Sequence, residues 1–453
     1  NLRGGGIRRA KASDGVEVLI PGDYPRQRNA LTLGYLTAPM IQTDFALGAV
    51  QLAPANPYGR YDYKASTSFT GDEGQKLNHW GLSGTVNVDL GNDFALTSIT
   101  AYRKLKTRFF VDIDATQFEL GDVFVGIDQN QISQEVQLKY DGDKLKGVFG
   151  LYYLKEENDS HQEAYADGLF AFGGFPITFT RLIDDAQTTK SFAAFGQATY
   201  DFSDQFSLTA GLRYTKEKKR YNRFTTTLSS LGLLNGLDYN FPNNLPAPFT
   251  GDDTASYDAW TPMVSASFKP TPDTLLYASA SRGFKAGGFN GRGNGNGDIS
   301  VTVNGVTTVM PSFAPEKVWT YEAGAKGSFL DGRVMLSAAL FHSTYQDFQA
   351  RVGNGTNVGL GGSFPVLNAG KLRIQGFEFE AMVRPVRALT LTASVGYLDS
   401  DYKRFDDPRR VPPAGFSCNP TGAAITCRPA FSPPLTMRLG ADYRIPLGTS
   451  ASL

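Results

Sequence analysis

The chain has 453 residues, 41% of them hydrophobic and 12% aromatic, and its 44 basic and 44 acidic side chains give a formal net charge of zero. A balanced charge removes the electrostatic reason to expect a nucleic-acid partner, because binding to phosphate backbones needs clustered positive charge. The most apolar stretch, 169–179, is interrupted by Gly173, Gly174 and Pro176, so no run approaches the roughly 18 apolar residues of a transmembrane helix. A position in a membrane would therefore require β-strands.

Residues 1–76 are rich in Gly, Pro and charged residues, and their alternation of apolar and polar residues is weak. We expect a long loop, one or two ill-defined strands and a second loop in this region.

From residue 77 onward, apolar and polar side chains alternate with a period of two. Trp80, Leu82, Val86 and Leu90 occupy even positions, and polar residues stand between them. Helical spacing does not fit such segments, so each is predicted to be a strand with one apolar face. Thirteen strands are predicted, at about 77–90, 93–115, 124–140, 144–158, 188–202, 205–226, 257–270, 272–290, 315–330, 333–352, 364–385, 388–404 and 432–446. Several exceed the ~9–11 residues that a tilted strand needs to cross hydrocarbon, so they are expected to project beyond the bilayer.

The connections between these strands alternate in length. Tight turns are predicted near 91–92, 141–143, 203–204, 270–273, 331–332 and 385–388, and long polar loops near 159–187, 227–256, 291–314, 353–363 and 405–431. Short periplasmic turns on one rim and long extracellular loops on the other are typical of outer-membrane barrels. The predicted fold is thus all-β, a transmembrane antiparallel β-barrel.

Several stretches resemble the strands of TonB-dependent outer-membrane receptors, and they occur in the order of that family. They are LTSITAYR (96–103), SQEVQL (133–138), GLYY (150–153), GLRYT (211–215), YASASRGFKAGGFN (277–290), PEKVWTYEAG (315–324), NAGK (368–371) and GFEFE (376–380). The resemblance covers more than three-quarters of the chain.

This resemblance implies a 22-stranded barrel occluded by an N-terminal plug. About 13–15 of those strands are expected here. We assign 1–76 to a poorly patterned loop and strand part of the barrel and 77–453 to its regular strands. The chain begins at Asn1 and ends at Leu453, and we expect it to be a fragment that lacks the plug, the TonB-contacting segment and the last strands.

The function implied by the resemblance is active uptake of a nutrient across the Gram-negative outer membrane, driven by the TonB–ExbB–ExbD complex through the missing N-terminal part. A ferric-siderophore complex is the first expectation for the small-molecule ligand, and cobalamin, haem and oligosaccharide are alternatives. A passive porin shares the alternation and the loop asymmetry, and a soluble propeller would need a repeat of about 40–45 residues that is not seen. Neither an enzyme activity nor a cofactor is expected.

Two groups of residues are candidates for binding. Phe284, Lys285, Phe289, Asn290 and Arg292 stand where a strand runs into a loop, and aromatic and Arg side chains there suit chelates and sugars. A structural role is the alternative for them. Charged residues on the polar faces of strands should face the lumen, since contact with lipid is costly. The resemblance then implies that they contact the plug, with a merely solvated wall as the alternative: Glu135, Arg213, Glu322, Glu378 and Glu380.

Metal sites are not expected, because His79, His161 and His342 lack paired ligand spacing. The acidic residues Asp112, Asp114, Glu119 and Asp122 match no EF-hand and are expected to lie on a solvated rim. Cys418 and Cys427 form a possible disulfide, with two reduced thiols as the alternative.

Overall fold

The computed structural model describes most of the chain. The described residues are 2–13, 15–29, 40–44, 48–53, 67–69, 74–112, 119, 121–165, 178–230, 253–291, 300–303, 306–309, 312–351, 366–368, 370–405, 429 and 432–445. No helix among them is long and apolar enough to span a bilayer.

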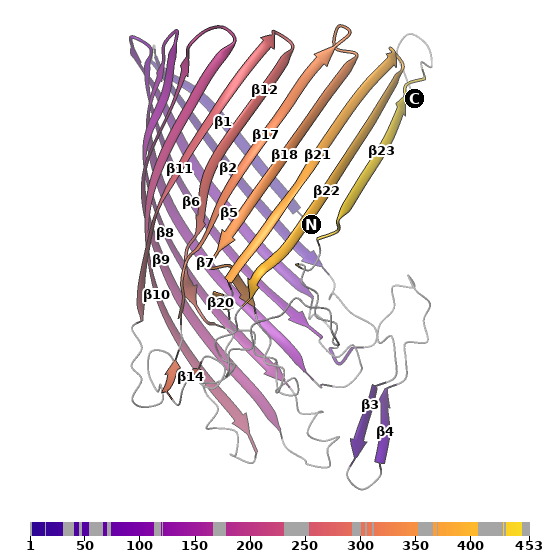
Figure 1. The fold of residues 1–453 in the computed structure, drawn as a ribbon. Helices are drawn as coiled ribbons and strands as arrows, with labels where there is room; N and C mark the ends of the chain where they lie inside the picture. The colour runs from indigo at the N-terminus through magenta and orange to yellow at the C-terminus, as the bar shows by residue number, and fades with distance from the viewer. Residues whose placement is uncertain are drawn as a thin grey trace.

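A single antiparallel sheet of 15 strands forms the fold, and it curves into a wide trough (Figure 1). Its strands, in spatial order, are β1 (Leu2–Ser13), β2 (Val16–Asn29), β5 (Gln75–Gly91), β6 (Phe94–Val111), β7 (Asp122–Asp141), β8 (Leu145–Tyr165), β9 (Phe179–Asp201), β10 (Phe206–Ser229), β11 (Thr254–Thr271), β12 (Thr274–Lys285), β17 (Glu316–Phe329), β18 (Val334–Gln346), β21 (Gly370–Val386), β22 (Leu389–Phe405) and β23 (Leu435–Tyr443). Strands β1 and β23 are the two edges of the sheet and do not pair with each other, so the described strands leave the barrel open.

Four two-stranded ribbons lie outside the main sheet. They pair β3 (Met40–Asp44) with β4 (Gly48–Ala53), β13 (Gly288–Phe289) with β16 (Ser312–Phe313), β14 (Ser300–Val303) with β15 (Val306–Val309), and β19 (Gln349–Arg351) with β20 (Val366–Asn368).

The two faces of the sheet differ in burial. Phe192 and Phe224 are 47% and 59% exposed, whereas their chain neighbours Ala193 and Arg223 are almost completely buried. Because side chains crowd on the concave side of a curved sheet, we call the side of Ala193 and Arg223 the inner face and the side of Phe192 and Phe224 the outer face. The register continues this division to β5, whose Trp80 and Leu82 lie on the outer face and are exposed. Exposed apolar side chains in such rows are what contact with acyl chains requires.

Tight turns join the strands at one rim, as predicted. Between β5 and β6 the chain reverses through Gly91, Asn92 and Asp93, all at positive φ. Gly, Asn and Asp tolerate that conformation best, so this turn closes without strain from a bulky side chain.

All thirteen strands predicted after residue 77 are present, and β1 and β2 add to them. The predicted loop at 159–187 was wrong at both ends, because β8 continues to Tyr165 and β9 begins at Phe179. These extensions escaped detection because charged residues such as Asp159 and Asp184 occupy their outer positions, so the apolar alternation is lost while strand pairing continues. The strand predicted at 272–290 ends at Lys285, and Gly288–Phe289 forms a ribbon strand.

Candidate functional site

Strands β8, β9 and β10 are much longer than a strand that only crosses a bilayer, and they project at their long-loop ends. These strands have 21, 23 and 24 residues, about twice the ~9–11 that a tilted strand needs. His161 lies sixteen residues from the short-turn end of β8. The polar groups described next therefore lie outside the hydrocarbon, at the mouth of the barrel.

Five inner-face residues meet at this level, and we call them the mouth cluster: Asp185, Tyr221, Arg223, Phe289 and Asn290. The hydroxyl of Tyr221 donates to Oδ1 of Asp185 at 2.6 Å, and Nε of Arg223 lies 3.6 Å from the same oxygen. The rings of Tyr221 and Phe289 stack at 5.3 Å with an interplanar angle of 17°. Asn290 is 2% exposed, and its Oδ1 accepts from the backbone N–H of Val366 at 2.8 Å.

Electrostatics make the mouth cluster sensitive to change. Burial raises the pKa of Asp185, while Arg223 and the hydroxyl of Tyr221 oppose that shift. The side chain of Arg223 is only 2% exposed. A buried cation of this kind depends on its carboxylate partner, because an uncompensated charge is costly away from water.

Hydrogen bonds fix the segment that follows β12 against the wall. Lys219 donates from Nζ to the carbonyl of Gly287 at 2.9 Å. Gln349 donates from Nε2 to the carbonyls of Ala286 and Ala314, and its backbone N–H donates to Glu316 at 2.7 Å. A Cβ on Gly287 would stand 2.2 Å from a backbone oxygen of Phe313. The run of small residues here is therefore required by close packing.

The predicted substrate-binding residues divide between the two faces. Phe289 and Asn290 belong to the mouth cluster, and Lys285 is exposed and pairs with Glu316. Phe284 pairs with Lys317 and shares the outer face with Trp319 and Tyr321. Arg292 lies outside the described residues. The structure gives Asn290 a structural hydrogen bond, and ligand contact by this group stays a prediction.

Charged residues predicted for the lumen all occupy inner-face positions. Arg213 lies over the rings of Tyr152 and Phe195 at 5.6 and 5.5 Å, and Glu135 accepts a hydrogen bond from Gln137. Glu322 accepts from the hydroxyl of Tyr277 at 2.6 Å. Glu378 and Glu380 are exposed on β21, and Glu380 lines a cavity near the short-turn rim with Arg438. Their contact with a plug stays a prediction.

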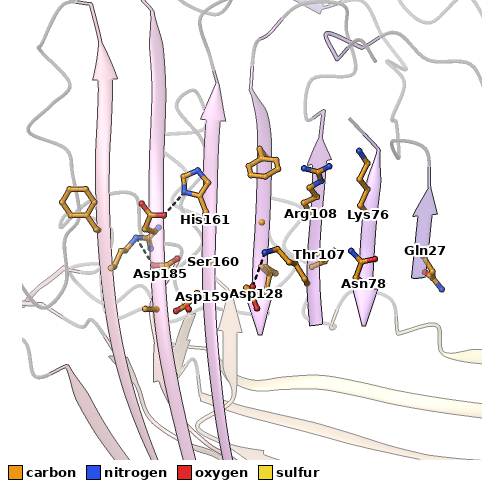
Figure 2. Close-up of a pocket in the computed structure, with 18 of the residues that line it drawn as sticks. Gln27, Lys76, Asn78, Thr107, Arg108, Asp128, Asp159, Ser160, His161 and Asp185 are labelled. Atoms are coloured by element: carbon orange, nitrogen blue, oxygen red, sulfur yellow. Dashed lines mark hydrogen bonds and ion pairs between the residues drawn. The ribbon is translucent and has the colours of Figure 1, made fainter. Parts of the chain in front are cut away.

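A cavity of about 1430 Å³ crosses seven neighbouring strands, β2 and β5–β10, and its lining includes Asp185 and Arg223 of the mouth cluster (Figure 2). Two cross-strand rows of outer-face side chains line it. The first row contains Arg26, Asn78, Lys106, Asp128 and Asp159; the second contains Arg28, Lys76, Arg108, His161 and Asp184. Since these rows continue the lipid-facing rows, the register places their side chains outside the lumen, whereas Asp185 and Arg223 belong to the inner face.

His161 is held between two carboxylates at one end of this cavity. Its Nδ1 lies 2.7 Å from Asp184 and its Nε2 lies 2.9 Å from Glu163. Hydrogen bonds to Asp184 and Glu163 raise the pKa of His161. The sequence offered no signal for this contact, because Asp184 comes from a different strand.

The structure bears on the acidic residues that were predicted to lie on a solvated rim, but not on the two cysteines. Among the described residues no group of three or more His, Cys, Asp or Glu side chains is arranged to hold a metal ion. The expectation of a solvated rim was wrong for Asp112 and Asp122, which are 6% and 0% exposed; Ser68 donates a hydrogen bond to Asp122. Asp114, Cys418 and Cys427 lie outside the described residues.

Residues 12–451 match the family model described as TonB dependent receptor-like, beta-barrel. A curated relative is the probable TonB-dependent siderophore receptor PiuA of Acinetobacter baumannii, 24% identical over 398 residues that cover 79% of this chain and 48% of the relative. The pesticin receptor of Yersinia enterocolitica is 26% identical over 272 residues, 59% of this chain and 34% of the relative. The chain thus spans about half the length of the first relative and about a third of the length of the second.

Solved structures agree on the fold. The ferric yersiniabactin uptake receptor FyuA from Yersinia pestis superposes with a TM-score of 0.60 at 17% identity, covering 98% of this chain and 63% of that one. The siderophore receptor PiuA from Acinetobacter baumannii gives a TM-score of 0.55 at 17% identity, covering 85% and 54%. At these identities the likeness concerns the fold alone.

Proposed function

This chain belongs to the TonB-dependent receptor family, whose barrels lie in the bacterial outer membrane, and we propose on this basis that it is part of a receptor for active uptake of a ferric-siderophore complex. The observation that carries the proposal is the family match over 12–451, since it spans nearly every strand of the sheet. The names of the relatives support the class of ligand.

The mouth cluster suits the first step of such uptake. Phe289 stacks on buried Tyr221, and the ion pair of Arg223 with Asp185 lies beside Tyr221. Aromatic faces bind planar parts of a chelate through stacking, so Phe289, which is only half-buried, is the residue of this cluster that would meet the ligand. The segment 286–291, held by Lys219 and Gln349, would position the stack over the lumen.

The later steps need no covalent chemistry. Inner-face carboxylates such as Glu322 and Glu378 would contact the plug of the complete receptor, and energy delivered through TonB, ExbB and ExbD would move that plug to open a path. Exposed aromatic and aliphatic residues on the outer face, such as Trp260 and Leu212, hold the wall in lipid while the plug moves.

Uptake of radioactive iron as a ferric siderophore by cells that express the full-length receptor tests this proposal. We expect uptake that stops when TonB is deleted or the proton gradient is collapsed. Uptake that persists in both conditions would mean passive diffusion, as in a porin, and would overturn the coupling. A parallel panel of cobalamin, haem and oligosaccharide tests the ligand: transport of one of these without any ferric siderophore would overturn the siderophore assignment alone.

A further inference from the structure

Three lysines stand side by side on the outer face of adjacent strands. Lys155 of β8 pairs directly with Lys190 of β9, and Lys190 pairs directly with Lys218 of β10. We call these three residues the lysine row. Strands in a sheet are about 4.8 Å apart, and like charges placed directly opposite one another destabilise a sheet. A row of this kind needs an anion to offset the repulsion.

Nearby carboxylates neutralise the lysine row only in part. Glu157, one row farther from the short turns, lies 2.6 Å from Lys155. Asp253 is paired with Arg220 at the far side, and Asp258 pairs across the strands with Lys216, in the row below. Within the part of the chain that the structure describes, neither Lys190 nor Lys218 forms a direct ion pair, although Glu157 interacts electrostatically with Lys190 and Asp253 with Lys218. Both side chains are exposed.

The depth of the lysine row coincides with the edge of the hydrocarbon. On β8, Leu145 to Tyr153 spans nine residues, which matches the ~9–11 that cross the apolar layer. The row directly below contains Tyr153 and Phe192, 40% and 47% exposed, and in the next row down the ring centroids of Tyr214 and the exposed Trp260 lie 4.8 Å apart. Exposed aromatic side chains in such rows form the interfacial girdle of a barrel. Lys155 follows two residues later, at the level of lipid headgroups.

We propose that the lysine row, with Lys216 and Arg220 beside it, binds the phosphate groups of an outer-leaflet lipid. Phosphate fits because it is a compact anion that ammonium groups on adjacent strands can contact together, and the acyl chains of the lipid would lie over Tyr153, Phe192 and Trp260. The site lies on the opposite face of the wall from the mouth cluster, so it binds the surrounding membrane and not the transported ligand. Its occupancy would stabilise β8, β9 and β10, the strands that carry the mouth cluster.

Affinity of the purified full-length receptor for a bisphosphorylated glycolipid, measured in non-ionic detergent, tests this site. The K190Q/K218Q variant should bind about five-fold more weakly for each lysine removed. The dephosphorylated glycolipid should bind weakly to both proteins, and inorganic phosphate should compete only at concentrations far above those of the lipid. K144Q/K146Q, which removes two lysines at the short-turn rim, is the matched control and should bind like the wild type.

Thermal unfolding gives a second measurement that a general loss of folding would not imitate. Without anionic lipid, K190Q/K218Q should unfold at a higher temperature than the wild type, because like-charge repulsion has been removed. With the bisphosphorylated glycolipid the order should reverse. Equal affinity of the wild type and K190Q/K218Q, equal binding of the dephosphorylated lipid, or the same order of unfolding temperatures with and without the lipid would each overturn the proposal.

Discussion

Replacing Phe289 by Ala should release the segment 286–291 from the barrel wall. The stack of Phe289 on Tyr221 contributes about 0.5–1.5 kcal/mol beyond burial, and loss of a half-buried Phe side chain removes about 1–1.5 kcal/mol of apolar transfer energy. Together these give about 1.5–3 kcal/mol, or roughly 10- to 150-fold more frequent opening. The barrel itself should stay folded, because its strand pairs are untouched.

Hydrogen exchange of the full-length receptor measures this opening. The backbone amide of Val366 is the reporter, because it donates to the side chain of Asn290 at 2.8 Å and loses that partner when the segment opens. Phe284→Ala is the matched control, since Phe284 belongs to β12 and faces outward. If the amide of Val366 exchanges equally fast in both variants, the stack does not hold the segment and the estimate fails.

Three further predictions concern Asp185, His161 and the inner-face glutamates. Asp185→Asn should lower the free energy of unfolding by about 3 kcal/mol, since it removes the carboxylate that lies 3.6 Å from the buried guanidinium of Arg223. Asp184→Asn, at an exposed neighbouring position, should lower it by less than about 1 kcal/mol in the same denaturation experiment, and equal losses would contradict this. His161 should titrate above its ordinary pKa of 6.5, so its contribution to stability is complete below about pH 6.5 and disappears as pH rises through the folded value; an NMR midpoint at or below 6.5 would be inconsistent with its two carboxylate contacts. Glu322→Ala or Glu378→Ala in the full-length receptor should increase channel conductance by loosening the plug, and unchanged conductance in both would argue against plug contact.

Alternation alone located the membrane-crossing strands. In β5, Trp80, Leu82 and Val86 alternate with polar residues, and the structure exposes them on one face. This works because side chains on successive strand residues point to opposite faces, so lipid on one side and a polar lumen on the other leave a direct record in the sequence. The lumen-facing positions of Glu135, Arg213 and Glu322 follow from the same rule.

The sequence pattern contains no comparable signal for contacts between distant segments. Asp185, Tyr221 and Phe289 come from three separate segments and meet only when β9 and β10 pair and the chain after β12 folds back onto them. The lysine row also depends on the pairing register. A shift of one residue between β8 and β9 would pair Lys155 with a residue of β9 that points to the other face of the sheet. Periodicity specifies which face a residue occupies, whereas the pairing register, set by turns and packing along the whole sheet, decides which charges and rings become neighbours.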